Sequence, residues 1–447
     1  MSITDYGGQG SVFLISSNGE TNRLPVPSGS PNDPLGWSPL KSFLCLLSMS
    51  IFTTIGLILV QGTTLLLVPL ATEYSPEEIA PFRLDVLSSL PSLFWGIGAV
   101  IWVPLSMAVG RRPVFIICTL LLTISTLMAA LSQDFHTHLT ARCLQGSAAA
   151  ISPSSMILMI LDIVFVHQRP RTIALYWCMC NATSNVSLAF TPYIVQVGGS
   201  WRAFYWLWLG PCFLTILLAV LWSPETYFAR PQTAFDEHIL SHADAGKGTA
   251  HTSSWEEVPW IKPMPDAPAM WRFSTFFKNI LFWNRSTTGG WPAMKAFPQY
   301  LAMKLARHDK GVHEPEHYLP SFIVPVIISS ISLALFGFGA EREWNWTWIV
   351  LLVGLNYFSA ISMATSNVLW ITEAFPRWAG AAITIVAAGG YGMSFVLGST
   401  IVPWIESDGI GNTYLGLGML TWVVGLIGFP IFCYGKRFRE YIYSRWD

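Results

Sequence analysis

The sequence predicts an all-α integral membrane protein built from helical bundles, with about 10 transmembrane helices divided as six and four. Three observations lead to this fold class. First, 52% of the 447 residues are hydrophobic and only 11% are charged, whereas about a quarter of the residues in soluble domains are charged. Second, long stretches of the chain contain no charged residue. Third, one polar segment separates these stretches into two groups. A water-soluble enzyme or a disordered chain is therefore excluded.

Ten stretches lack Asp, Glu, Lys and Arg altogether, and each contains at least 19 residues. About 20 helical residues cross the hydrocarbon core, and a charge at its centre costs about 2.5–3.5 kcal/mol on insertion scales. The stretches are 42–72, 86–110, 113–133, 143–161, 172–201, 203–224, 318–340, 344–372, 378–405 and 409–435. The first is too long for the core of a signal peptide, so we expect it to be a retained helix.

The basic residues indicate how the chain crosses the membrane. With the N-terminus in the cytoplasm, 21 of the 25 Lys and Arg residues fall in cytoplasmic segments, in line with the positive-inside rule. Both termini are then cytoplasmic. The predicted parts are an N-terminal tail (1–41), a six-helix bundle (42–224), a cytoplasmic central segment (225–317), an incomplete four-helix bundle (318–435) and a tail (436–447). The central segment is either a solvated linker or holds an amphipathic helix on the inner membrane face.

Several classes of protein are excluded by what the sequence lacks. The 25 basic and 26 acidic residues nearly balance, which argues against a nucleic-acid partner. The seven Cys residues lie in apolar runs without the spacing of metal ligands, so we expect buried thiols and no metal site. No nucleophile with a base and no phosphate-binding Gly loop is present. We therefore predict that the protein is not an enzyme and needs no cofactor.

Short motifs recur at the ends of the predicted spans. They are Gly110-Arg111-Arg112-Pro113 after the second span, Arg142 with Gln145 and Gly146 in the fourth, Asp162 just after it, Pro192 in the fifth, and Pro224-Glu225-Thr226 at the end of the sixth. Together these residues resemble the major facilitator superfamily, in its fungal drug-efflux-like branch. The resemblance extends over about residues 32–440.

Each motif has a physical interpretation besides the resemblance. Gly110 permits a tight turn, while Arg111 and Arg112 either hold neighbouring helix ends and anionic headgroups or act as positive-inside anchors. Arg142 lies next to an uncharged span, so it is either a functional residue or reaches the outer interface by snorkelling. The family usually has Asp at the position of Met107, which weakens a charge-relay role for this motif.

Other motif residues are open to a packing interpretation. Gly146, Ala150 and Ser154 recur every fourth residue, a spacing that lets helices approach closely. Asp162 and Glu373 are carboxylates at the edges of spans, where an interfacial role is favoured over proton transfer. The sequence Asn345-Trp346-Thr347 fits a glycosylation acceptor at Asn345, although it lies close to the bilayer.

A substrate cavity in these spans would be lined by uncharged polar and aromatic side chains. The candidates are Gln61, Asn181, Asn185, Tyr193, Asn356, Tyr357, Asn367 and Trp370. Each can instead bond a neighbouring helix. Such a cavity would suit a large, mostly apolar, neutral molecule.

The resemblance implies a transporter that moves small organic molecules by rocking two bundles about a midplane site. It further implies efflux of a drug or secondary metabolite across the cell membrane, with proton coupling. The family's Gly next to Pro192 is Thr191 here, so the export direction is less strongly indicated. The alternatives are a nutrient importer and a truncated protein without transport activity.

The second bundle departs from the family pattern. The family has twelve helices arranged as six and six, whereas this sequence predicts six and four. Helices seven and eight are therefore expected to be missing, with a junction near residues 300–307. Loss of an even number of helices keeps each later helix in its orientation.

Overall fold

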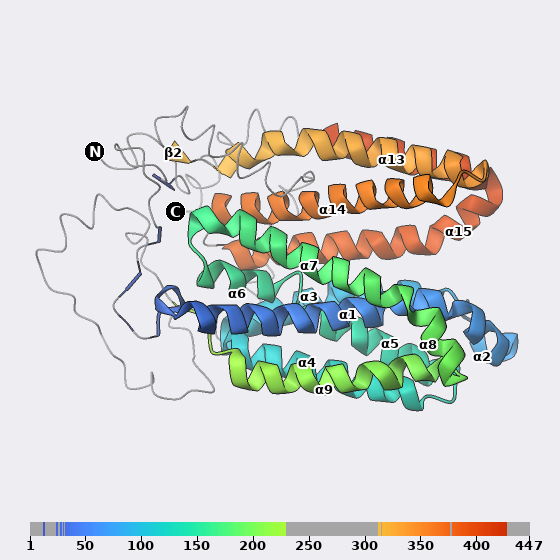
Figure 1. Ribbon diagram of the computed structural model, residues 1–447, viewed down its shortest axis with the longest axis horizontal. Helices are drawn as coiled ribbons and strands as arrows, with labels where there is room; N and C mark the ends of the chain where they lie inside the picture. The colour runs from blue at the N-terminus through green and yellow to red at the C-terminus, as the bar shows by residue number, and fades with distance from the viewer. Residues whose placement is uncertain are drawn as a thin grey trace, which may run out of the picture.

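The structure is a computed structural model that describes residues 32–228, 312–313, 315–375 and 378–426, together with residues 12, 13, 24, 25, 27, 28 and 30 (Figure 1). Most of the central segment, including the expected junction and the alternative of an amphipathic helix, lies outside these residues. So does the tail after residue 426. Below, the proximal end of the molecule is the end at which α1 begins, on the left in Figure 1, and the distal end is the opposite one.

In the N-terminal half, the described chain between residues 32 and 228 forms only helices and the turns and short segments that join or flank them. Its elements are η2 (Pro34–Gly36), α1 (Pro39–Glu73), α2 (Pro76–Ile79), α3 (Val86–Val109), α4 (Arg111–Leu131), α5 (Phe135–Ala149), α6 (Ser155–Ile163), η3 (Val166–Gln168), α7 (Arg169–Ala189), α8 (Thr191–Gly198) and α9 (Arg202–Trp222). Apolar side chains from most of these helices form one large buried core.

The C-terminal half contains η7 (Pro315–Phe322), α13 (Ile323–Glu341), α14 (Trp346–Ala374) and α15 (Ala379–Leu426). The last of these is two helices joined at Gly409, whose φ of 79° interrupts the helix. Such a backbone conformation is readily adopted by glycine alone. A short antiparallel pair joins β1 (Val12–Phe13), near the N-terminus, to β2 (Val312–His313), just before the second half, with Val12 opposite His313.

The all-α membrane fold predicted from the sequence is confirmed. Seven of the described helices are long and apolar enough to cross a membrane. Two predicted spans are each made of two shorter helices, α5 with α6 and α7 with α8. Pro153 and Pro192 lie at these breaks. Proline interrupts a helix because it has no N–H for the helical hydrogen bond and clashes with the preceding turn.

The fourth span begins earlier than the charge pattern predicts. Helix α5 starts at Phe135, where Asp134 accepts hydrogen bonds from the Thr137 backbone N–H at 2.7 Å and from its hydroxyl at 2.9 Å. These bonds hold the pKa of Asp134 below its usual value. Arg142 therefore lies inside the helix instead of at its start. Because Arg142 is buried within α5, its charge does not mark a helix boundary.

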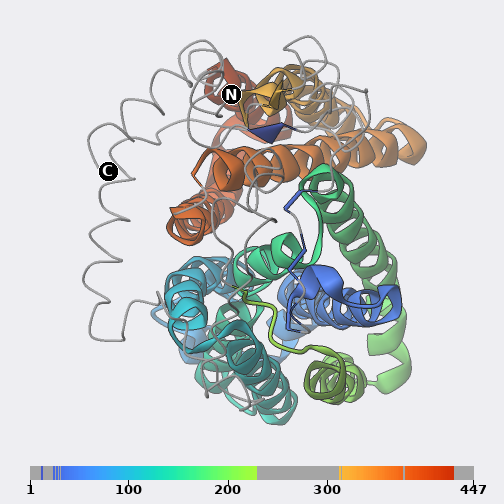
Figure 2. The ribbon, with the colours of Figure 1, turned by 90° about the vertical axis from the view of Figure 1, so that its left-hand side faces the viewer.

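The two halves pack against each other along α3 and α15, as Figure 2 shows from the proximal end. In the middle of the seam the rings of Trp95 and Tyr391 are stacked, with centroids 4.7 Å apart. Near the proximal end, a β-carbon added to Gly380 would lie 2.5 Å from Sδ of Met107. Near the distal end, a β-carbon on Gly398 would lie 3.7 Å from that of Ser89. This seam is close-packed over most of its length.

Candidate functional site

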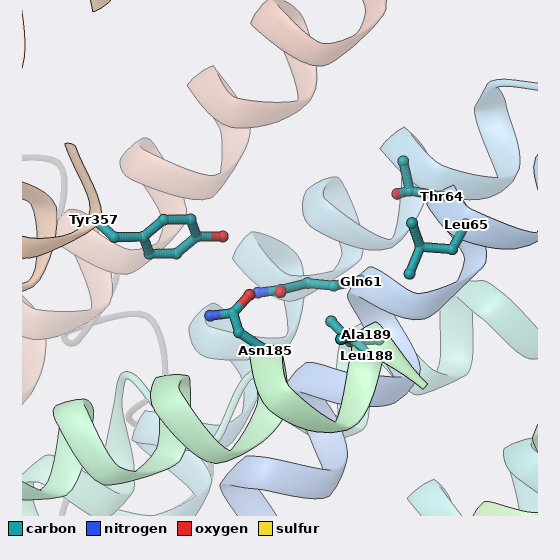
Figure 3. Close-up of a pocket in the computed structure, with 7 residues that line it drawn as sticks. All are labelled: Gln61, Thr64, Leu65, Asn185, Leu188, Ala189 and Tyr357. Atoms are coloured by element: carbon teal, nitrogen blue, oxygen red, sulfur yellow. The ribbon is translucent and has the colours of Figure 1, made fainter. Parts of the chain in front are cut away.

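A cavity of about 460 Å³ lies between α1 and α7 of the first half and α14 of the second (Figure 3). Its lining residues are Gln61, Thr64, Leu65, Asn185, Leu188, Ala189 and Tyr357. All seven are uncharged. Two amides, a hydroxyl and a phenol supply its polar groups, and the remaining three side chains are apolar.

The polar groups come from three helices and face one another. In Figure 3 the amides of Gln61 and Asn185 lie close together, and the hydroxyl of Tyr357 points toward them from the opposite half. Asn185 donates one amide hydrogen to the carbonyl oxygen of Asn181, one turn earlier, at 2.8 Å. Its carbonyl oxygen and second N–H remain for a ligand. The cavity can thus both donate and accept hydrogen bonds.

Three of the eight candidate cavity residues, Gln61, Asn185 and Tyr357, are brought together here. Two others make contacts within or between helices. Asn181 donates to the carbonyl oxygen of Trp177 in its own helix at 2.8 Å. Asn356 of α14 donates to the hydroxyl of Ser329 in α13 at 3.2 Å. Of the two, only Asn356 bonds a neighbouring helix, as the alternative interpretation expects.

The remaining three candidates do not line this cavity. Tyr193 of α8 is 65% exposed. Trp370 is buried and meets the ring of Phe375 edge to face, with centroids 6.4 Å apart. Asn367 is half-buried in α14, toward its proximal end. The roles of all eight residues stay predictions.

Four lining residues were not singled out from the sequence. Thr64 lies three positions after Gln61, and Leu188 and Ala189 lie three and four positions after Asn185. Residues at this spacing share a helix face. The positions of Gln61 and Asn185 in the sequence are therefore enough to predict these neighbours as lining residues. Leu65, four positions after Gln61, follows the same rule.

Arg142 is completely buried inside the first half and does not snorkel to an interface. Its guanidinium donates to the carbonyl oxygens of Leu59 and Val60 in α1 at 2.6 and 2.7 Å, and of Leu87 in α3 at 3.2 Å. A further N–H donates to Oε1 of Gln145 at 2.5 Å. The planar fork of the guanidinium therefore joins three helices.

A second polar cluster lies at the proximal end. Glu225, just after α9, accepts the backbone N–H groups of Arg111 and Arg112 at 3.2 and 3.1 Å. It thereby caps the N-terminus of α4, where a carboxylate is favoured by the helix dipole. The Arg111 guanidinium forms an ion pair with Asp162. At the adjoining turn, Gly110 has a φ of 114°, and a β-carbon there would lie 2.8 Å from Oε2 of Glu225.

The remaining motif residues have structural surroundings. Gly146 of α5 packs directly on Pro91 of α3, a close approach that a side chain would prevent. Pro192 lies in the first turn of α8, where a missing N–H is tolerated. Pro224 lies in the extended stretch after α9. Asn345 caps α14, accepting a hydrogen bond from the N–H of Thr347 at 3.1 Å; its glycosylation stays a prediction.

Among the described residues, no group of three or more His, Cys, Asp or Glu side chains is placed to hold a metal ion. The six cysteines in this part of the chain are all free thiols.

The chain is similar to known proteins along nearly its whole length. It is 22% identical to Protein HOL1 of Saccharomyces cerevisiae over 545 residues, covering 95% of this chain and 91% of that protein. The fold matches the human organic anion transporter MFSD10 (TM-score 0.56, 13% identity, 88% of this chain and 100% of that one). It also matches the proton:xylose symporter XylE (TM-score 0.57, 12% identity, 92% and 100%).

The alignment with HOL1 also bears on the length of the chain. Its 545 positions exceed the 447 residues of this chain by 98. HOL1 therefore carries at least that many residues without a counterpart here, which is more than two spanning helices and a short loop require.

The Major Facilitator Superfamily model matches residues 42–430, which include both helical halves and the cavity between them. The chain therefore belongs to the major facilitator superfamily, whose members are multi-pass secondary transporters of small molecules and not enzymes.

Proposed function

We propose that the protein exports an uncharged small organic molecule, a drug or a secondary metabolite, across the cell membrane. The observation that supports this most strongly is the cavity between the halves, in which Gln61 and Asn185 face Tyr357. A site formed by both halves is where rocking of one half against the other exposes a ligand to each side in turn.

The uncharged lining supports a neutral substrate. An ion that leaves water needs a countercharge or many strong hydrogen bonds, and all seven lining residues are uncharged. An organic anion, the substrate class in the name of MFSD10, has no cation to meet here. The volume of about 460 Å³ lies in the range of sites for drug-sized ligands.

Direction and energy source are supported by resemblance. The motif around Gly110, Arg111 and Arg112 and the proline at position 192 resemble fungal efflux proteins. XylE, which shares the fold, is a proton symporter. We therefore propose that a proton gradient drives export. The distribution of basic residues supports a cytoplasmic proximal end.

The test is loss of a neutral drug from cells. Yeast lacking its own efflux pumps would express the protein and be loaded with radiolabelled fluconazole, which is neutral, or with rhodamine 6G, a cation. We expect faster loss of fluconazole than in cells without the protein, no change for rhodamine 6G, and loss of the difference when a protonophore collapses the proton gradient.

The same assay separates the alternatives. Greater accumulation of fluconazole in expressing cells would favour an importer. Unchanged retention of both compounds, with a twelve-helix efflux protein active in the same cells, would favour a protein without transport activity.

A further inference from the structure

The distal half of α14 is exposed on most of its surface and packs against α13 on one face. Its exposed side chains are Trp346, Trp348, Val350, Leu351, Val353 and Leu355, with exposed fractions from 37% to 73%. Successive residues of a helix point 100° apart, so these positions cover the helix apart from the face with Leu352 and Asn356, which packs on α13. An apolar surface of this extent is stable in lipid and not in water. This part of α14 therefore meets α13 on one face and lipid on the others.

The cavity borders on this lipid-exposed part of α14. Tyr357, which forms its wall on that side, is 40% exposed, and Leu65 on the opposite wall is 47% exposed. Beside the cavity on α7, Val186 and Phe190 are 62% and 59% exposed. No residue of α7 or α14 between positions 182 and 190 or between 346 and 358 carries a charge. The mouth between the two helices is thus uncharged and bordered by exposed apolar side chains.

Within the part of the chain that the structure describes, the cavity is closed on the α3/α15 flank and at the proximal end. On the opposite flank, α3 and α15 are packed together, with Trp95 stacked on Tyr391 in the middle of the seam. At the proximal end, Tyr318 of η7 is buried and shares a hydrogen bond with Glu373 at the end of α14, close to Arg169 at the start of α7. Figure 2, viewed from the proximal end, shows α14 and α7 meeting there and diverging away from the viewer.

We propose that the cavity is entered sideways from the bilayer, through a portal between α7 and α14, by an uncharged amphiphile. Its hydrogen-bonding head would lie against Gln61, Asn185 and Tyr357, and its apolar body along the mouth formed by these helices. This inference rests on the proposed function only in taking the cavity as the substrate site. It adds the route of entry and the division of the ligand into a polar head and an apolar tail.

The route can be tested with a thiol at the cavity mouth. Ala189 lines the cavity and is exposed. Ala189→Cys would be made in a background with Cys178 and Cys433 replaced by Ser, labelled with bimane and reconstituted in phosphatidylcholine liposomes. Val186→Cys on the same helix is the lipid-facing control. Ser407→Cys, exposed at the distal end, is the aqueous control.

The proposal predicts that doxyl-labelled phosphatidylcholine quenches bimane at Ala189→Cys at least half as strongly as at Val186→Cys. Before labelling, the same thiol should react at least tenfold more slowly with a charged methanethiosulfonate than Ser407→Cys does. Weaker quenching together with fast aqueous reaction would show a water-filled vestibule and overturn the proposal. Neither readout requires transport, so failure of the efflux assay and failure of this proposal are separate results.

The ligand class is tested by protection of the thiol. Monodecanoylglycerol and decyl sulfate share a ten-carbon chain, but only the second is charged. We expect the glycerol ester to slow labelling of Ala189→Cys by a lipid-soluble maleimide at least threefold, without slowing that of Val186→Cys, and decyl sulfate to have no effect. Equal protection by both compounds, or by neither, would contradict an uncharged head group in the site.

Discussion

Replacement of Arg142 by Met tests whether a guanidinium holds the first helical half together. The buried side chain donates four hydrogen bonds at 2.5–3.2 Å, three of them to backbone carbonyls of α1 and α3. Hydrogen bonds to charged groups contribute about 1.5–3 kcal/mol each, which gives on the order of 6–12 kcal/mol in total. Because one side chain makes all four bonds, their contributions are not additive, and the total is an upper bound. Burial of the charge offsets much of it, and we take a net contribution of about 2–4 kcal/mol.

We therefore expect Arg142→Met, which fills a similar volume without donors, to lower the free energy of unfolding by about 2–4 kcal/mol. Arg142→Lys should be more damaging than Met. Its ammonium remains a buried charge, yet its compact donors cannot span carbonyls on two helices.

The assay is thermal unfolding in detergent of variants made in a Cys178→Ser, Cys433→Ser background, because Cys178 is exposed in the folded protein. A fluorogenic maleimide then reports when buried thiols such as Cys118 become exposed. Wild-type melting of Arg142→Met would refute a structural role for the guanidinium. A Lys variant more stable than the Met variant would show that the charge matters and the fork geometry does not.

Three further predictions use matched variants. Asn185→Leu should raise the half-saturating fluconazole concentration for transport about two- to tenfold, since one hydrogen bond contributes about 0.5–1.5 kcal/mol; Asn181→Leu, which removes an amide bonded within its own helix, should leave it unchanged. Glu225→Ala should lower the unfolding free energy, measured by thermal melting, by about 1–2 kcal/mol through loss of the α4 cap. Glu225→Gln, which keeps a hydrogen-bond acceptor, should lower it by less. Gly98→Ala should lower the unfolding free energy by about 1–3 kcal/mol, because its β-carbon would lie 2.6 Å from Cβ of Ala150 and from the carbonyl oxygen of Ser147. The control Gly210→Ala should not lower it, because nothing lies within 4 Å of a β-carbon at that position.

Much of the fold follows from the position of charges alone. A span must be free of uncompensated charge, so uncharged stretches mark helices such as α3 and α4 to within two residues of their ends. The same reasoning misplaced the start of α5. Arg142 is satisfied by carbonyls from sequence-distant helices, and no local pattern shows such partners.

The cavity was only partly predictable for a related reason. Polar residues in spans are recognised from the sequence, but whether an amide faces a cavity or another helix depends on which helices become neighbours. Gln61, Asn185 and Tyr357 face one space, whereas Asn356 meets Ser329 across α13 and α14. Whether the side of α14 that carries Tyr357 is exposed likewise depends on how the helices of the second half pack, and no local sequence pattern specifies this.

The most direct test of the proposed transport is flux through the purified protein. Reconstituted in liposomes with an imposed pH gradient, the wild-type chain should move radiolabelled fluconazole against its concentration gradient, faster than liposomes containing no protein. The Asn185→Leu variant should require a higher concentration for the same rate, and Asn181→Leu should match the wild type. Absence of any gradient-driven flux, with a twelve-helix member of the superfamily active in the same preparation, would contradict transport by this chain.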